Sequence, residues 1–202
     1  MLRVDLHLHS HYSHDGKSSL VELIERATEC RLDRIALTDH NTVEGALLLA
    51  GKAPQLAIVG EEIKTTEGEV IGLFINARIA PFLVPEEAMD QIHQMGGLTY
   101  MPHPLDRRRA NFLAERMVAL APRIDIVETY NPWCDADANR AAALLADELG
   151  KVTATGSDSH SAEELGRSWM EMEDFEDAAD FLDKLRYARH VVTASSGTGR
   201  RA

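Results

Sequence analysis

The stretch LRVDLHLHS, residues 2–10, indicates both the fold and the chemistry of this chain. Apolar and polar residues alternate over Leu2–Leu8, which predicts a β-strand whose successive side chains point to opposite faces. His7 and His9 lie two positions apart and therefore share one face of that strand. Two imidazoles on one face can chelate a cation, although an isolated pair of this kind is more often a packing feature.

Strand and helix patterns alternate along the rest of the chain with short connections. We expect strands at residues 34–37, 56–59, 70–75, 98–101, 125–129, 152–154 and 190–194, and helices at about residues 19–31, 43–50, 85–95, 110–120, 137–149 and 175–188. The first helix starts with the capping-box sequence Ser19-Leu20-Val21-Glu22, and a turn at Gly68 should pair the strand at 70–75 with its predecessor. This alternation predicts a mainly parallel α/β barrel or open sheet in one domain.

The composition is typical of a globular protein, because 45% of the 202 residues are hydrophobic and 27% are charged. No apolar run approaches the roughly 20 residues of a membrane span. The N-terminus has no secretory-signal pattern, and Cys30 and Cys134 are not spaced as a metal-binding pair, so we expect a cytoplasmic location. The net charge of −12 argues against binding of extended nucleic acid through a broad basic face. Nothing in the sequence indicates the oligomeric state.

Histidine and acidic residues recur where the expected strands end. The groups in these positions are His7 and His9, Asp39 and His40, Glu61 and Glu62, His103, Asn131, and Asp158 and His160. A (β/α) barrel carries its chemistry at the C-terminal ends of its strands, so these groups should lie on one rim. Each group alone can be explained as a solvated loop end or a packed turn. Their shared position, in a chain with nine histidines, predicts a metal site.

At these segments the chain resembles the PHP (polymerase and histidinol phosphatase) domain family of metal-dependent phosphoesterases. The resemblance rests on Asp5-Leu6-His7-Leu8-His9-Ser10, Thr38-Asp39-His40-Asn41-Thr42, Met101-Pro102-His103-Pro104 and Gly156-Ser157-Asp158-Ser159-His160-Ser161, with Gly60-Glu61-Glu62 between them. It implies a distorted (β/α)7 barrel over residues 1–195, carrying a two- or three-metal centre. We expect residues 196–202 to form a disordered tail, because they are small, polar and basic.

The resemblance also implies a set of metal ligands, position by position. One metal would be held by His7, His9, Glu62 and Asp158, with Glu62 bridging to a second metal that is held also by His103. A third metal would be held by Asp15, His40 and His160. Asn131 stands where some family members have a further histidine or a cysteine, so the sequence is compatible with either two or three metals.

Such a set of ligands suits phosphoester hydrolysis, which needs a hydroxide at neutral pH and neutralisation of charge on the phosphoryl oxygens. Divalent ions lower the pKa of bound water and clamp the phosphoryl oxygens. With Asp15, Glu62 and Asp158 as the anionic ligands, three divalent ions leave the site about three charges positive, which can attract a small phosphorylated substrate to an acidic protein. Mixed imidazole and carboxylate ligands favour zinc, manganese or iron over magnesium and calcium.

Other polar residues near these segments are candidates for roles beside the metals. The expected catalytic residues are Asp39, His11 and His14, and the expected substrate-binding residues are Arg107, Arg167 and Asn131. The aspartate would orient a neighbouring ligand, and the two histidines would gate the substrate or donate a proton to the leaving oxygen. The arginines would hold a phosphate. A solvated position is the alternative for the histidines and for members of the run 107–109.

The expected reaction is therefore hydrolysis of phosphoesters of a small metabolite or nucleotide. One alternative is a non-catalytic or accessory PHP module of DNA metabolism, since such domains also occur within bacterial DNA polymerases. The nearly complete ligand set and the lack of a polymerase region favour an enzyme. A second alternative is an amidohydrolase-type hydrolase, which usually adds a metal-bridging lysine, but Lys64 follows Glu62 without replacing it.

Overall fold

The structure is a computed structural model that describes residues 1–109 and 112–193, so the expected tail at 196–202 lies outside the described residues. The strands are β1 (Leu2–Leu8), β2 (Arg34–Leu37), β3 (Ala57–Lys64), β4 (Glu69–Leu73), β5 (Leu98–Met101), β6 (Ile126–Tyr130), β7 (Val152–Thr155), β8 (Ser168–Met172) and β9 (Arg189–Val192). The helices are α1 (Leu20–Cys30), α2 (Glu44–Lys52), α3 (Pro85–Gln94), α4 (Ala114–Leu120), α5 (Ala136–Glu148) and α6 (Ala178–Leu185), with 3-10 turns at Ala121–Arg123 and Ala162–Glu164.

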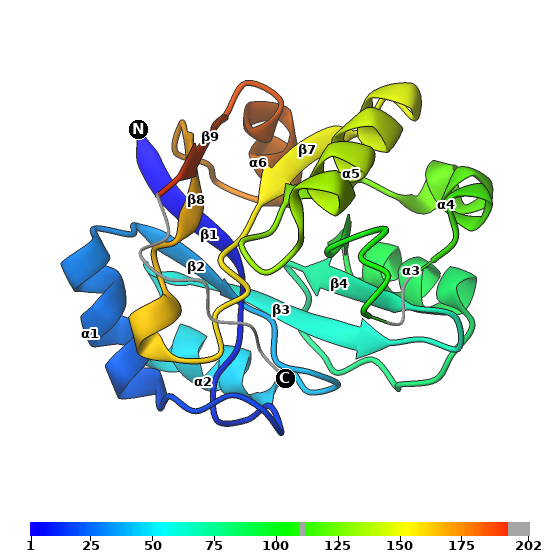
Figure 1. The fold of residues 1–202 in the computed structure, drawn as a ribbon. Coiled ribbons are helices and arrows are strands. Elements are labelled where there is room, and N and C mark those ends of the chain that lie inside the picture. Colours follow the sequence, from blue (N-terminus) through cyan, green and yellow to red (C-terminus); the bar gives the residue numbers. More distant parts are fainter. Residues whose placement is uncertain (110–111, 194–202) are drawn as a thin grey trace.

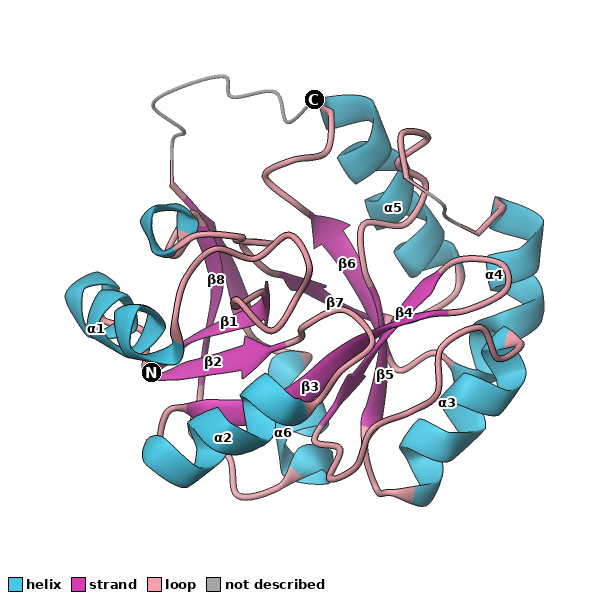
Figure 2. Cartoon of the chain, turned by 90° about the horizontal axis from the view of Figure 1, so that it is seen from below, coloured by secondary structure: helices cyan, strands magenta, loops and turns pink. Residues whose placement is uncertain are grey.

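The strands form one sheet in the order β7-β6-β5-β4-β3-β2-β1-β8-β9. The sheet curls so that the segment after β7 reaches β1, where Asp158 N donates to His7 O at 2.7 Å and His9 N donates to Ser159 O at 2.8 Å. These bonds nearly close the sheet into a distorted barrel, with α1 to α5 around it (Figures 1 and 2). The fold class implied by the family resemblance is thereby confirmed.

Two apolar clusters correspond to the inside and the outside of the barrel. One contains residues from strands β1 to β8, for example Leu6, Ile58 and Tyr100, together with Phe181 of α6. Side chains from so many strands meet only within the barrel, so α6 covers one of its ends. The other cluster joins the alternate strand positions, such as Leu8, to the apolar faces of α1 to α5. No helix among residues 1–109 and 112–193 is long and apolar enough to cross a membrane.

A bulge in β1 aims the first histidine into the site. Asp5 pairs with Ile35 of β2, but the next pair is Leu8 with Leu37, so β1 advances by three residues where β2 advances by two. As a result, Leu6 packs inside the barrel and Leu8 packs outside it, although they are two positions apart. An extra residue in one strand re-aims the side chains that follow. His7 therefore faces the interior at the C-terminal end of β1.

Several expected elements differ from the structure in ways that affect the site. The sheet is mixed in its pairing, not mainly parallel, because β4 and β8 run against their neighbours. Strand β8 was not expected from the sequence at all. Strand β3 extends to Lys64 because β4 supplies it with antiparallel hydrogen bonds from Gly60 onward, so Glu62 lies within a strand and not after one. Helix α4 begins at Ala114, later than expected, while α1 has the predicted capping box at Ser19.

Barrel closure depends on a close approach between Gly156 and β1. A Cβ at Gly156 would lie 2.4 Å from His7 Cβ and 2.7 Å from His7 N, which backbone atoms cannot accommodate without moving. We expect Gly156→Ala to lower the free energy of unfolding of the metal-free protein by about 1–3 kcal/mol, the usual cost of overpacking. Urea denaturation measures this change. Gly51→Ala is the control, since its Cβ would meet nothing within 4 Å on α2. Equal stability of the two variants would contradict this close packing.

Candidate metal centre

The eight predicted ligands converge on one end of the barrel. His7 lies one residue before the end of β1, Glu62 lies in β3, and the others lie on the loops that follow β1, β2, β5 and β7. All are buried except Asp15 and His40, which are partly exposed. Seven of them occur in groups of three whose nitrogen or oxygen atoms lie within 4.8 Å of one another: His9 with His40 and His160, His7 with His103 and Asp158, and His7 with His9 and Glu62.

Glu62 is the centre of this cluster. Its Oε1 lies 3.1 Å from His103 Nε2. Its Oε2 lies 3.3 Å from His7 Nε2, from His9 Nε2 and from His40 Nδ1. One carboxylate thus faces four imidazoles, one at Oε1 and three at Oε2.

Asp158 lies beside the first two histidines. Its Oδ1 is 3.5 Å from His7 Nε2, 3.4 Å from His9 Nε2 and 3.6 Å from His160 Nδ1. This buried oxygen has no hydrogen-bond partner among the described residues. Asp158 also has φ of 48°, a left-handed conformation that costs energy for a residue with a side chain. The fold therefore holds a strained residue in place to present this oxygen to the cluster.

Asp15 forms a more exposed part of the cluster with two histidines. Its Oδ2 lies 3.1 Å from His160 Nε2 and 3.6 Å from His40 Nε2, and its side chain is 36% exposed. The loop that carries it is tightly packed, since a Cβ at Gly16 would lie 1.9 Å from Ser10 O. Lys17 N also donates to His160 O at 2.8 Å, which joins this loop to the segment after β7.

The donor set fits divalent cations. His7 Nε2 and His9 Nε2 face each other at 3.2 Å, and both also face carboxylate oxygens. A buried carboxylate oxygen without a hydrogen bond, such as Asp158 Oδ1, is costly unless a cation neutralises it. Mixed imidazole and carboxylate donors converging within 4.8 Å match the ligands of zinc, manganese and iron. The residues present therefore fit divalent metal ions.

Without a metal the carboxylates of the cluster are ionised, and the raised pKa values of His7 and His40 mean that a cation would displace protons from these two imidazoles. Burial alone raises the pKa of Glu62, but the charges of His40 and His7 outweigh it and hold that pKa well below its usual value. The pKa of Asp158 is likewise held well below its usual value, because the charges of His7 and Arg109 outweigh the effect of burial. Burial lowers the pKa of His9 to about 3, so this imidazole is neutral and keeps a lone pair for a metal.

Glu128 is a functional candidate that the sequence reasoning missed. It lies on β6, is buried, and its Oε1 lies 3.2 Å from His7 Nδ1 and accepts from Tyr100 OH at 2.9 Å. Its Oε2 accepts from His103 N at 2.6 Å. A carboxylate on the far nitrogen of a metal-binding histidine fixes its tautomer and orientation. The signal in the sequence was an acid at an inward position of an apolar strand, where burial without a role would be costly.

We expect Glu128→Gln to weaken metal binding by about 10- to 100-fold, the usual effect of removing such a supporting carboxylate. The side chain keeps its size, but it loses the charge that holds His7 with its Nε2 lone pair toward the cluster. Titration of metal-stripped protein with Mn²⁺ measures the change. Glu148→Gln, at the exposed end of α5, removes an equal charge and should bind as the wild type does. Equal affinities in the two variants would show that Glu128 has no part in orienting His7.

The residues expected to be catalytic lie in different surroundings. Asp39 is in none of the groups of possible metal ligands among the described residues, and its two oxygens accept from Ser10 N at 2.6 Å and Ser10 Oγ at 2.7 Å. It therefore shapes the loop after β1. His11 is exposed, and its Nδ1 lies 3.2 Å from Ser18 O. His14 is also exposed, but its Nε2 lies 3.9 Å from Asp15 Oδ2, at the mouth of the site.

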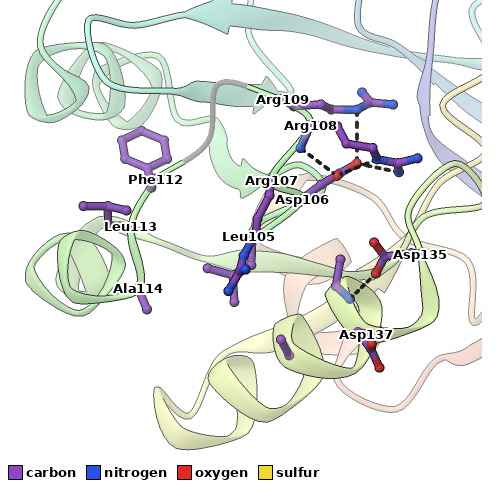
Figure 3. A pocket seen from close by; sticks show the side chains of 12 residues that line it. Leu105, Asp106, Arg107, Arg108, Arg109, Phe112, Leu113, Ala114, Asp135 and Asp137 are labelled. Atoms are coloured by element: carbon purple, nitrogen blue, oxygen red, sulfur yellow. Dashed lines mark hydrogen bonds and ion pairs between the residues drawn. The ribbon is translucent and has the colours of Figure 1, made fainter. Parts of the chain in front are cut away.

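The three residues expected to bind substrate lie in different surroundings. Arg107 is exposed and lines a cavity of about 900 Å³ between the loop after β5 and the start of α5 (Figure 3). Arg167 lies over the ring of Trp133, 4.5 Å from its centroid. Asn131 is buried behind Asp158, and its Nδ2 donates to Asp158 Oδ2 at 3.2 Å. Cys134 Sγ donates to Asp106 and is not among the clustered ligands.

Comparisons with known proteins identify the family of the chain and related folds. The model of the PHP domain family matches residues 5–79, and that of the PHP-associated family matches residues 136–189. Two uncharacterized proteins of Methanocaldococcus jannaschii are each 34% identical to the chain. The first matches over 145 residues, 65% of this chain and 83% of the relative. The second matches over 176 residues, 84% of this chain and 70% of the relative.

Two further matches concern a polymerase and a solved structure. An error-prone DNA polymerase of Mycobacterium tuberculosis is 39% identical over 75 residues, 37% of this chain and 6% of the polymerase. A two-domain protein of Bacteroides vulgatus containing a predicted PHP-like metal-dependent phosphoesterase has a TM-score of 0.75 and 18% identity, over 95% of this chain and 64% of that chain. At this identity the likeness concerns the fold. By its sequence matches, the chain belongs to the PHP domain family.

Proposed function

We propose that the protein is a metal-dependent phosphoesterase that holds two or three Mn²⁺, Zn²⁺ or Fe ions and hydrolyses phosphoesters of a small metabolite or nucleotide. The observation that carries the proposal is the position of Glu62, one carboxylate facing the nitrogens of four histidines at 3.1–3.3 Å. Asp158 and Asp15 add anionic oxygens on either side of these histidines. Membership of the PHP domain family supports the same reaction.

In this proposal His7, His9, Glu62 and Asp158 hold one ion, Glu62 and His103 hold the second, and Asp15, His40 and His160 hold the third. When bound, the ions would lower the pKa of a water and neutralise charge on the phosphoryl oxygens. The partial exposure of Asp15 makes its side of the cluster the natural entrance. His14, exposed next to Asp15, is positioned to give a proton to the leaving alcohol oxygen.

The cavity beside the cluster suits the remainder of a small substrate. Its volume of about 900 Å³ falls in the usual range of small-ligand sites, roughly 300–1,000 Å³. Its charged lining residues are three arginines and three aspartates, namely Asp106, Arg107, Arg108, Arg109, Asp135 and Asp137, and its apolar lining includes Leu105 and Leu113. This mixture suits a small organic molecule with both polar and apolar parts and does not form the broad basic face that extended nucleic acid requires.

An accessory role in DNA metabolism is the second candidate, and the match to part of a DNA polymerase favours it. A module of this kind would bind metals without hydrolysing phosphoesters. The amidohydrolase alternative has less support. Lys64 is paired with Glu69 at 3.5 Å, and Glu69 lies within 4.8 Å of His40 and Glu62. The group that faces the four histidines is nevertheless the carboxylate of Glu62 and not a lysine.

A substrate screen in labelled water tests the proposed function. Metal-loaded protein is incubated with phosphomonoesters, phosphodiesters and cyclic phosphates in ¹⁸O water, and the released products are examined by mass spectrometry. We expect the label in the phosphate product, because water attacks phosphorus. Label in the alcohol, a covalent phosphoprotein, or no turnover of any class with fully loaded protein would contradict the proposal.

A further inference from the structure

The two oxygens of Asp158 have different surroundings. Oδ1 points to the imidazoles of His7, His9 and His160 at 3.4–3.6 Å and has no hydrogen-bond partner among the described residues. Oδ2 accepts a 2.7 Å hydrogen bond from Arg109 Nη2 and a 3.2 Å hydrogen bond from Asn131 Nδ2. One oxygen is thus left for a metal, while the other is used by the protein.

Arg109 is itself fixed in this position. Its Nε lies 3.7 Å from Asp106 Oδ2, and its backbone N donates to Asp106 O at 3.0 Å. Asp106 is buried and accepts two hydrogen bonds from Arg108 (Figure 3). Arg108 Nε donates to Asp106 Oδ1, and Arg108 Nη2 donates to Asp106 Oδ2, both at 2.9 Å. The Arg109 guanidinium therefore lies between two buried carboxylates, those of Asp106 and Asp158.

The second donor to Asp158 is equally constrained. Asn131 is buried, and its Oδ1 accepts from Trp133 N at 2.9 Å, which sets which end of the amide faces Asp158. Its Nδ2 also donates to Glu128 Oε2 at 3.0 Å. The amide thereby connects Asp158 with the carboxylate that supports His7.

We propose that Arg109 is a positioning residue of the metal centre, which holds Asp158 as a ligand through Oδ1 alone, with Asn131 as the second donor. The inference rests on the metal-binding part of the proposed function and extends it to a residue that is not itself a ligand. A carboxylate can bind a cation through one or both oxygens. Two hydrogen bonds on Oδ2, one of them charge-assisted, oppose rotation toward two-oxygen binding and keep Oδ1 aimed at the cluster.

The direction of the change in metal affinity after removal of Arg109 distinguishes a positioning role from electrostatic repulsion of the metal. A guanidinium close to a cation site repels the cation, so loss of its charge alone should tighten metal binding. If the guanidinium only competed with the metal for Asp158, its removal should also tighten metal binding. If Arg109 positions Asp158, its removal instead weakens binding, although a repulsive charge has gone.

Metal titration of the full chain tests the inference. Metal-stripped wild type, Arg109→Gln and Arg107→Gln are titrated with Mn²⁺, and the visible spectrum of each Co²⁺-loaded protein is recorded. We expect Arg109→Gln to bind the tightest ion about 10- to 100-fold more weakly and to show a changed Co²⁺ spectrum. Arg107→Gln removes the same charge from the same loop and should keep the wild-type affinity and spectrum. Arg109→Lys, which keeps the charge and one donor, should recover part of the loss.

Unchanged or tighter binding by Arg109→Gln, with an unchanged Co²⁺ spectrum, would overturn the inference. If the wild type itself binds no metal, the proposed function fails first. If thermal unfolding shows that Arg109→Gln is not folded, Asn131→Ala takes its place, because it removes the other donor to the same oxygen. Wild-type affinity in a folded Asn131→Ala would then overturn the inference as well.

Discussion

Glu62→Gln is expected to remove at least one bound ion per chain and to lower phosphoesterase activity by about 10²- to 10³-fold or more. The substitution keeps the shape of the side chain but removes its negative charge. Both oxygens of Glu62 face imidazole nitrogens, so this charge serves both sides of the centre. Metal analysis and turnover assays on the same preparation measure the two effects together.

The neighbouring Glu61 provides a matched control. It is also buried on β3, but its Oε2 accepts from Ile79 N at 2.9 Å, away from the cluster. Glu61→Gln should therefore keep the wild-type metal content and turnover. A Glu62→Gln protein that retained all of its ions and its activity would show that Glu62 is a structural carboxylate and does not bridge metals.

Metal loading is expected to raise the midpoint of thermal unfolding by about 10 °C or more. An ion at 100 times its Kd contributes roughly 2.7 kcal/mol, and 1 kcal/mol corresponds to about 2–4 °C for a domain of this size. Two ions therefore account for the expected shift. Part of this binding free energy comes from neutralising the buried carboxylates of Asp158 and Glu62. Calorimetry of stripped and Mn²⁺-loaded protein measures the difference.

Calcium at the same concentration is the control for this prediction. Ca²⁺ prefers an all-oxygen shell, and the cluster is rich in imidazole nitrogen, so its effect should be much smaller. A shift below about 2 °C with Mn²⁺, Zn²⁺ and Fe²⁺ alike would indicate that the cluster does not bind these metals at useful concentrations.

The positions of the clustered histidines could be predicted from the sequence because parallel strands bring their C-terminal ends to one rim. His7, His103 and His160 follow β-patterns that are visible without any knowledge of pairing. The orientation of these side chains is harder to predict from the sequence. The bulge in β1 that turns His7 inward depends on the register with β2, which no local pattern reveals.

The role of Arg109 and the extension of β3 could not be predicted, for a related reason. Strand β3 continues past Glu62 because β4 pairs with it, and hydrogen bonds to a distant strand leave no mark on local propensity. Arg109 was one of three consecutive arginines, and only the loop conformation shows which of them reaches Asp158. Arg107, the arginine favoured by its sequence position, is exposed.

The number of metal ions per chain tests the central claim most directly. The protein is stripped of metal, loaded with Mn²⁺, Zn²⁺ or Fe²⁺, freed of excess ions and analysed by mass spectrometry of the elements. We expect two or three ions per chain with at least one of these metals, since one carboxylate and its four imidazoles lie between two further acidic groups. Fewer than one ion per chain with every metal would contradict the metal centre, and with it the proposed hydrolysis of phosphoesters.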